Sequence, residues 1–347
     1  MQHLALTSKI SLLLFLLLAG CNNSTNNKEV FGISGTTMGT TFHIKVVLTN
    51  SQKKKINLDS LKIKIDSLLV FVNQEMSTYI DNSELSMFNK LRTKDWLPIS
   101  QDLAYVFNEA IKISKLSNGA YDVTVGPLVN LWGFGPEKNQ MKIPSDSVIE
   151  KRKKEVGYKY LHLRMDPPAV RKSNPDLYCD LSSIAKGFGV DKVSELLLAK
   201  HINNFMVEIG GELRTSGNKP DHKKWKIGIS SPDGSAKIRK VVLLENLSMA
   251  TSGDYNNNFV VNGKEYSHTI DPRTGRPITH NLVSVSVLDS SCMVADGFAT
   301  AIDVLGPIDG YEFALKNKIP VLMFIKEKNK FVEKSTKEFD KLLKILE

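Results

Sequence analysis

The spacing of apolar residues indicates a chain that mixes helices with strands. Residues 58–72 repeat apolar side chains at helical spacing, whereas residues 30–48 alternate around a glycine-threonine turn, as two paired strands would. Short β-type segments dominate from residue 205 to 288, and Asn262-Gly263 is typical of a hairpin turn. Because strands outnumber the crossover helices that parallel pairing requires, we predict an α+β fold with mixed, largely antiparallel sheets flanked by helices.

Other elements follow from capping and turn signals. Ser100 is placed to cap a helix that Asn118-Gly119 ends. We find no internal repeat and no linker between domains. The pattern further predicts helices at 144–156, 183–200, 295–305, 308–316 and 336–346, and strands at 158–164, 205–209, 213–216, 225–230, 237–244, 258–261, 282–288 and 321–325.

The N-terminus has the features of an export signal. Lys9 precedes an apolar run over residues 10–18, which is too short to cross a bilayer as a mature helix. Ala19-Gly20-Cys21 then resembles the bacterial lipoprotein processing signal, in which the cysteine is acylated, for example with palmitate. A plain cleaved signal or a chance cysteine are the alternatives. We therefore expect a signal peptide at 1–20, a polar tether at 21–29 after lipidated Cys21, and one folded domain at 30–347.

This arrangement predicts an exported, membrane-anchored lipoprotein that faces the periplasm. Asn22 does not resemble the aspartate associated with inner-membrane retention, which hints at the outer membrane but leaves both membranes open.

Composition and charge narrow the possible partners. Hydrophobic residues make up 41% and charged residues 24% of the chain, a balance that can bury a core. The net charge of +9 suits an anionic membrane surface or a phosphorylated ligand, but also an ordinary solvated basic surface. No basic cluster is interleaved with aromatic residues, so we expect no nucleic-acid partner. Cys179 and Cys292 are expected as separate buried thiols, although an exported compartment also permits a disulfide.

Two segments, 180–187 and 295–300, carry oxygen ligands at helical spacing. Asp296 and Thr300 are four residues apart, and Asp180 and Ser183 are three apart, so each pair shares a helix face if the segment is helical. Carboxylate and hydroxyl oxygens are what Mg²⁺ prefers. Lys186 adds a positive charge near a helix N-terminus, which already favours anions. Together the segments indicate chemistry on a phosphoanhydride.

Other candidates are each open to a structural reading. Asp122 lies three residues after Gly119 and either binds a ligand or caps a helix, and Gly210-Gly211 either admits a ligand or makes a sharp hairpin. His268 is the best candidate for a general base because histidine titrates near neutral pH. Arg273 and Arg276 have the charge to reach phosphates, within a stretch that is also rich in turn residues. The sequence contains no P-loop, Rossmann fingerprint, nucleophile elbow or zinc helix.

In their order along the chain, these segments resemble the ApbE family, flavin transferases that use FAD as donor. The resemblance spans most of the chain. It rests on residues 35–40, 76–79, 119–127, 180–187, 208–212, 250–253, 267–277 and 295–300.

The resemblance implies an ApbE-like (T-fold-like) architecture and Mg²⁺-dependent transfer of FMN from FAD to a threonine hydroxyl of an acceptor protein, with release of AMP. It implies FAD contacts at Met38, Tyr79, Ala120, Tyr121, Asp122, Asp180, Lys186 and Ile270, and a metal site around Ser183, Asp296 and Thr300. Ser183 stands where threonine is common in the family, and Lys186 where some members have glutamate. We add the hypothesis that His268 accepts the proton of the acceptor hydroxyl.

Two other functions stay open at this point. In an FAD pyrophosphatase, water would replace threonine and yield FMN and AMP. A flavin-binding lipoprotein would hold FAD without turnover. For the transferase, the family suggests acceptor flavoproteins such as subunits of membrane redox pumps.

Overall fold

One large antiparallel sheet organises the part of the chain that the computed structural model describes, which is residues 27–136, 143–233, 235, 237–253, 258–261, 264–328, 330–342 and 344–345. Its strand order is β1-β2-β6-β7-β10-β15-β16-β17, and every neighbouring pair is antiparallel. The predicted α+β class is therefore confirmed. The strands are β1 (Lys28–Thr37), β2 (Thr40–Thr49), β6 (Phe205–Ile209), β7 (Glu212–Ser216), β10 (Ser248–Gly253), β15 (Leu282–Asp289), β16 (Val321–Glu327) and β17 (Lys330–Ser335).

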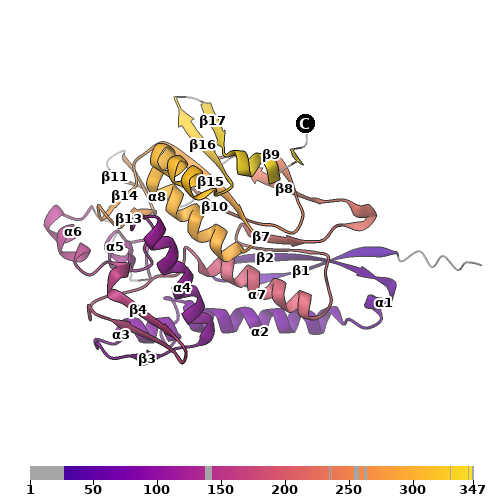
Figure 1. The fold of residues 1–347 in the computed structure, drawn as a ribbon, viewed down its shortest axis with the longest axis horizontal. Helices are drawn as coiled ribbons and strands as arrows, with labels where there is room; N and C mark the ends of the chain where they lie inside the picture. Colours follow the sequence, from indigo (N-terminus) through magenta and orange to yellow (C-terminus); the bar gives the residue numbers. More distant parts are fainter. Residues whose placement is uncertain are drawn as a thin grey trace, which may run out of the picture.

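Smaller sheets and helices surround this sheet (Figure 1). The small sheets contain β3 (Leu97–Pro98), β5 (Pro168–Lys172) and β4 (Leu161–Met165); β18 (Lys344–Ile345), β9 (Ile238–Leu244) and β8 (Trp225–Ser230); β11 (Asn258–Val261) and β12 (Lys264–Ser267); and β13 (Ile270–Asp271) and β14 (Arg276–Pro277). The helices are α1 (Asn50–Lys53), α2 (Leu58–Met76), α3 (Glu84–Lys90), α4 (Gln101–Leu116), α5 (Gly126–Leu131), α6 (Asp146–Lys153), α7 (Ala185–Ala199), α8 (Cys292–Asn317) and α9 (Lys337–Leu342).

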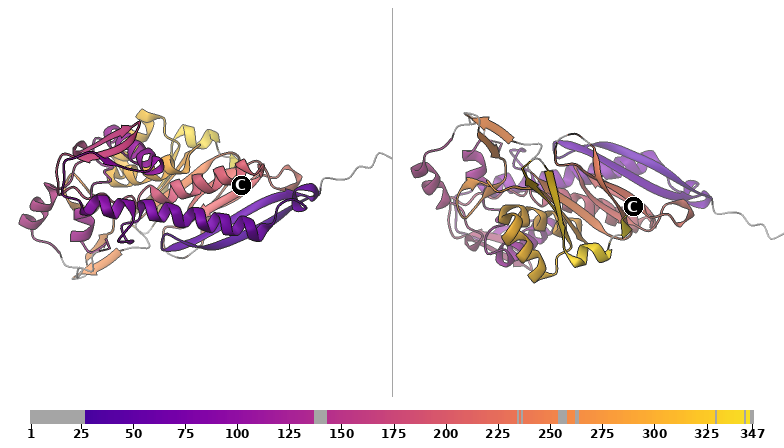
Figure 2. Two further views of the ribbon diagram at one scale, coloured as in Figure 1. Left: turned by 90° about the horizontal axis from the view of Figure 1, so that it is seen from below. Right: turned by 90° about the horizontal axis from the view of Figure 1, so that it is seen from above.

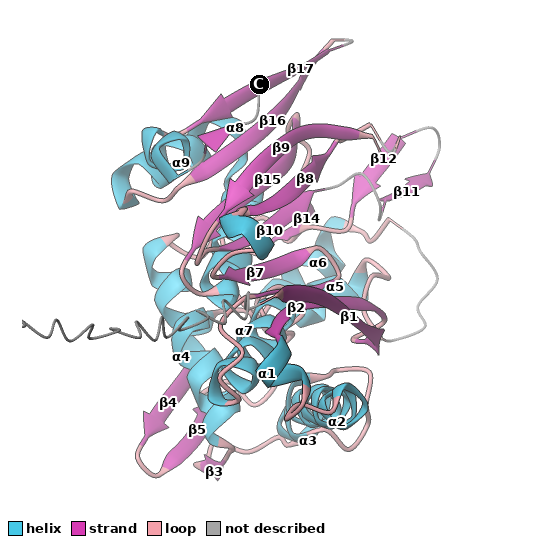
Figure 3. Cartoon of the chain, turned by 90° about the vertical axis from the view of Figure 1, so that its right-hand side faces the viewer, coloured by secondary structure: helices cyan, strands magenta, loops and turns pink. Residues whose placement is uncertain are grey.

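Alternation along the strands separates the two faces of the large sheet. Ala250 and Val287 point toward α8, whereas their neighbours Met249 and Leu288 pack with β8 and β9 on the opposite face. Helix α7 contacts β6 and β7 on the α8 side, and α2 lies beside α7, as Figure 2 also shows. The end-on view in Figure 3 shows these helices below and beside the sheet. The described chain is thus a sheet covered by helices on one face and by a smaller sheet on the other.

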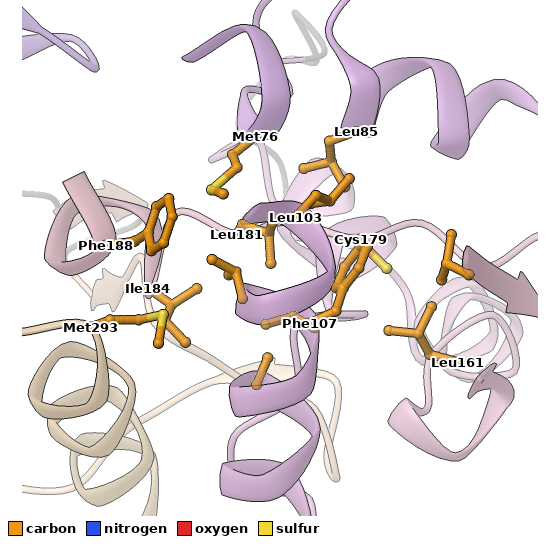
Figure 4. Packing of buried hydrophobic residues seen from close by; sticks show 14 of the residues in the cluster. Met76, Leu85, Leu103, Phe107, Leu161, Cys179, Leu181, Ile184, Phe188 and Met293 are labelled. Atoms are coloured by element: carbon orange, nitrogen blue, oxygen red, sulfur yellow. The ribbon is translucent and has the colours of Figure 1, made fainter. Parts of the chain in front are cut away.

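A shared apolar core fixes the loop before α7 against four other helices. Side chains from α2, α3, α4, α7 and α8 converge there with the loop residues Leu181 and Ile184 (Figure 4). Both loop side chains are fully buried. Burial of a Leu or Ile side chain contributes roughly 1.5–3 kcal/mol, so this packing holds the 180–184 segment firmly in place.

Several predicted boundaries were wrong for local reasons. The helix expected at 183–200 begins at Ala185, because residues 182–184 form a turn instead. The helices expected at 295–305 and 308–316 form one element, α8, which bends where Gly306 has a φ of 80° before Pro307. The helix expected to reach residue 346 ends at Leu342, and Lys344–Ile345 pair with β9.

One predicted helix is shorter in the structure, and one strand was not predicted. The helix expected at 144–156 covers Asp146–Lys153, and a 3-10 turn at Tyr158–Tyr160 precedes β4. Strand β10, with the sequence Ser-Met-Ala-Thr-Ser-Gly, was not predicted because it lacks the bulky β-branched pattern. The predicted signal peptide and Cys21 lie outside the described residues. Within the described residues, no helix is both long and apolar enough to cross a bilayer.

Candidate active site

The two segments with oxygen ligands meet where α7 packs on α8. The backbone N–H of Gly187 donates to Asp296 Oδ2 at 3.0 Å. A Cβ atom at Gly187 would lie 2.5 Å from the carbonyl oxygen of Cys292, so glycine is required for this close approach. The structure therefore brings residues 180–187 and 295–300 into direct contact.

A carboxylate on α7 holds the start of α8. Asp191 Oδ1 accepts from the backbone N–H of Cys292 at 3.1 Å, and Oδ2 accepts from Met293 at 3.0 Å. Oδ2 also accepts from the Ser291 hydroxyl at 2.7 Å, and Arg214 donates to Oδ1 at 2.7 Å. These bonds satisfy free amide groups of the α8 N-terminus. Sequence reasoning missed Asp191, because its partners lie about a hundred residues away.

The turn before α7 positions Asp180 and Ser183. The Asp180 backbone N–H donates to the Val123 carbonyl at 2.7 Å, while Asp180 Oδ1 accepts from the Ser182 N–H at 2.8 Å. Ser183 donates its hydroxyl to the phenolic oxygen of Tyr121 at 3.3 Å. Burial raises the pKa of Tyr121, so its phenol stays neutral. Asp180 and Ser183 therefore sit on a hydrogen-bonded turn and not within the helix.

All the described residues of the predicted site line two adjoining cavities. A polar cavity of about 480 Å³ is lined by Ala120, Tyr121, Asp122, Asp180, Ser183, Lys186, His268, Ile270, Asp296 and Thr300. A neighbouring cavity of about 890 Å³ is lined by Met38 and Tyr79 together with the C-terminal part of α2. Asp180, Ser182 and Lys186 line both cavities. They therefore mark the junction between the two.

Two buried carboxylates, Glu212 and Asp296, and the half-buried Lys186 line the polar cavity together. Lys186 Nζ lies 3.0 Å from Glu212 Oε1. Burial opposes a charge on Lys186, but Asp296 and Glu212 outweigh it and raise the pKa of the lysine. Burial raises the pKa of Glu212 and of Asp296, and Lys186 acts against both increases. The lysine is thus held as a cation by two carboxylates.

Turns shape the walls of both cavities. Met38 and Gly39 have φ values of 50° and 71° at the tip of the β1–β2 hairpin, which puts Met38 into the larger cavity. Gly210 and Gly211 join β6 to β7 with φ values of 59° and 107°. A Cβ at Gly210 would lie 3.3 Å from Lys186 Cδ, so the glycine leaves room for the lysine stem.

Asp122 and His268 are both held by contacts within the protein. Asp122 does not cap α5; its Oδ1 accepts from the N–H and hydroxyl of Thr124, and its Oδ2 from the Tyr158 N–H at 2.7 Å. Burial raises the pKa of Asp122, while these hydrogen bonds lower it. The ring of His268 packs edge-on against Phe134, with centroids 6.3 Å apart.

The two arginines that were candidates for phosphate contacts are engaged within the protein. Arg273 forms two side-chain bonds to Asp271, at 2.9 and 2.8 Å. Arg276 donates to Asp146 at 2.7 Å. Neither lines the polar cavity. Cys179 and Cys292 are free and buried, as expected.

Some residues of the polar cavity had no predicted role. Glu212, Thr251, Ser252 and Gly253 line it from β7 and β10. Their segments contribute to the family resemblance, but only the tertiary structure brings their side chains to the cavity. Thr251 and Ser286 hydroxyls lie 2.8 Å apart, and Ser252 donates to Asp303 Oδ2 at 3.0 Å.

The predicted metal ligands suit a hard cation. Within the described residues, no group of three His, Cys, Asp or Glu side chains is arranged to bind a metal. Ser183, Asp296 and Thr300 instead offer one carboxylate and two hydroxyls around one cavity. Mg²⁺ commonly binds through one or two carboxylates and completes its shell with water and substrate phosphates. The donor set therefore fits Mg²⁺ if a phosphate ligand is present.

Comparison with known proteins agrees with this site. The family model described as "ApbE family" matches residues 38–323 of the chain. The chain belongs to the ApbE family. A Vibrio cholerae relative named FAD:protein FMN transferase is 44% identical over 335 residues, which cover 96% of this chain and 98% of that protein. A Haemophilus influenzae protein of the same name is 44% identical over 340 residues, covering 96% of each chain.

Solved ApbE structures have the same fold. The flavin transferase ApbE from Vibrio cholerae superposes with a TM-score of 0.84 at 42% identity, covering 91% of this chain and 100% of that one. The apo form of the Pseudomonas stutzeri flavinyl transferase ApbE gives a TM-score of 0.84 at 36% identity, covering 91% and 97%. The resemblance inferred from the motifs is confirmed.

Proposed function

We propose that the protein is an Mg²⁺-dependent FAD:protein FMN transferase that attaches FMN to a threonine hydroxyl of an acceptor protein and releases AMP. One observation carries the proposal. A polar cavity and a larger cavity adjoin, and Asp180 and Lys186 lie at their junction. FAD has two flat ring systems joined by a pyrophosphate, so it matches two adjoining cavities with charged groups between them.

Ser183, Asp296 and Thr300 would hold the metal ion. When bound, Mg²⁺ would polarise phosphoryl oxygens and offset negative charge that develops on them. Lys186 contributes a further positive charge from α7, beside the same cavity.

The chain's own residues position and deprotonate the reactants. His268 lines the polar cavity and takes the proton of the acceptor hydroxyl. A bond forms between the threonine oxygen and the FMN-side phosphorus, while the bond from that phosphorus to the AMP oxygen breaks. Met38, Tyr79, Ala120, Tyr121 and Ile270 supply apolar surface for FAD, and Asp122 and Asp180 supply polar contacts.

A single incubation distinguishes this function from the two alternatives. The purified chain is mixed with FAD, Mg²⁺ and a candidate acceptor flavoprotein, and the products are separated. Flavin fluorescence on the denatured acceptor, with stoichiometric AMP, supports transfer. Free FMN with AMP indicates a pyrophosphatase, and intact bound FAD indicates a binding protein. Replacing the acceptor threonine by valine is the matched control.

We also propose that Cys21 anchors the protein to the inner or outer membrane with its folded domain in the periplasm. The acceptors would then be exported flavoproteins, such as subunits of membrane redox pumps. Labelled palmitate should be incorporated into the wild-type protein but not into Cys21→Ala. After cell fractionation, this variant should be found in the soluble fraction, whereas the wild type should be found in the membrane fraction.

A further inference from the structure

Glu212 is a buried carboxylate for which the reaction above has no role. It is the first residue of β7, directly after the Gly210-Gly211 turn, and its side chain is 4% exposed. Its Oε1 pairs with Lys186, and its Oε2 is buried without a hydrogen-bond partner among the described residues. An ionised carboxylate is expensive to bury, so this placement needs a physical reason.

Lys186 has two carboxylates near it but forms an ion pair with one. Its ammonium pairs with Glu212 at 3.0 Å, whereas Asp296 accepts from the backbone of Gly187. Asp296 nevertheless has a strong electrostatic effect on Lys186. A lysine stem is flexible, so without Glu212 the ammonium would be drawn toward Asp296.

We infer that Glu212 is a positioning residue that holds the Lys186 ammonium away from Asp296, which leaves Asp296 free to bind a divalent cation. The inference rests on the proposed function, because it assumes that Asp296 is a metal ligand. An ammonium and Mg²⁺ compete for the same carboxylate, since both are cations. With Glu212 in place, the site keeps a lysine charge for the phosphates and a carboxylate for the metal.

The inference predicts a specific pattern in a double-mutant cycle. Glu212→Gln keeps the shape of the side chain but removes its charge, and we expect the dissociation constant for Mg²⁺ to rise about 10-fold. In Glu212→Gln/Lys186→Met the competing ammonium is gone, and Mg²⁺ affinity should return to within about 3-fold of the wild type. A role limited to folding would not be repaired by removing the lysine.

The measurement is isothermal titration calorimetry of the full folded domain with Mg²⁺ at a saturating concentration of FAD and without acceptor protein, because the donor set fits Mg²⁺ when a phosphate ligand is present. Glu208→Gln is the matched control, because Glu208 Oε1 accepts from Gly211 in the same turn, whereas the ion pair of Lys186 is with Glu212. This control should bind Mg²⁺ as the wild type does. Glu212→Asp, which keeps the charge, covers the case in which Glu212→Gln does not fold, and should lose no more than about 3-fold in affinity.

Two failures are distinguishable. If the wild type binds Mg²⁺ and Glu212→Gln binds it equally well, or if Lys186→Met gives no recovery, the inference is wrong while the proposed function stands. If the wild type itself takes up no Mg²⁺ and also transfers FMN without it, the metal part of the proposed function is wrong as well.

Discussion

The two adjoining cavities differ in how their residues are held. In the polar cavity, Asp296, Lys186 and Glu212 are tied to one another or to backbone groups of neighbouring elements. In the larger cavity, Tyr79 is 70% exposed, and the wall is formed largely by one end of α2 and the hairpin tip at Met38. The polar cavity holds charged side chains at fixed positions, whereas the larger cavity offers surface for contact with FAD. We therefore expect substitutions in the first to affect the chemical step and substitutions in the second to affect binding.

Loss of the Asp296 carboxylate should have the largest effect. Asp296→Ala removes the single carboxylate of the proposed metal site, which would cost several kcal/mol of charge stabilisation, or about 10³-fold in rate. FMN transfer measured across a Mg²⁺ titration should stay at this lowered rate and show no metal dependence. Turnover that Mg²⁺ still stimulates in this variant would contradict the site.

Loss of the histidine should slow transfer without weakening binding. General-base assistance gives roughly 10²–10⁴-fold, so His268→Ala should lower the transfer rate by that factor. The FAD dissociation constant, measured by flavin fluorescence, should change less than about 3-fold. An unchanged transfer rate would exclude His268 as the base.

The contact between α7 and α8 should be sensitive to one methyl group. Gly187→Ala places a Cβ 2.5 Å from the Cys292 carbonyl oxygen, so the helices must move apart. Overpacking of this kind costs about 1–3 kcal/mol of unfolding free energy, measurable by urea denaturation. Gly32→Ala, where nothing lies within 4 Å of the added atom, is the control and should change stability little. Equal stability of the two variants would show that α7 and α8 are not tightly packed there.

Substitutions in the larger cavity should change the affinity for FAD. Tyr79→Ala removes an aromatic surface worth roughly 1 kcal/mol or slightly more, which corresponds to an FAD dissociation constant raised about 5- to 10-fold. The transfer rate at saturating FAD should stay close to that of the wild type. A drop in the saturated rate with unchanged affinity would reverse the assignment of the two cavities.

The smallest effect on FMN transfer is expected from a change at the α2 residue Glu75, which alters how stability depends on pH. Burial raises the pKa of Glu75 from its ordinary value of 4.5 to about 7, and Asp102 and Glu84 act in the same direction while Ser100 and Lys192 oppose it. The folded state then binds the proton more tightly than the unfolded state. Its stabilising contribution is complete below pH 4.5 and is lost as pH rises toward 7.

Glu75→Gln should remove this part of the pH dependence. Relative to the wild type, the variant should gain about 3 kcal/mol in unfolding free energy between pH 4.5 and 8. Denaturation at both pH values measures it. Parallel pH profiles for the two proteins would show that the buried carboxyl does not titrate in this range.

The features of the site that were predictable depend on residues close together in the sequence, and the others depend on residues far apart. The pair Asp296 and Thr300 was predictable because helical spacing is local, and α8 is helical there. Ser183 was predicted as the first residue of a helix but lies in the turn that follows Asp180, because hydrogen bonds to Val123 and Tyr121 hold this segment. Arg273 and Arg276 had plausible ligand roles in the sequence, but their partners Asp271 and Asp146 engage them within the protein.

The sequence by itself determined the fold class, the family and the chemical types of the site, because periodicity, turn residues and ordered motifs are properties of short segments. Only the tertiary structure decided which of these residues meet. The Gly187–Asp296 bond, the capping of α8 by Asp191 and the pairing of Lys186 with Glu212 join segments that are far apart in the chain. Their energies come from burial and close packing between elements, which no local pattern encodes.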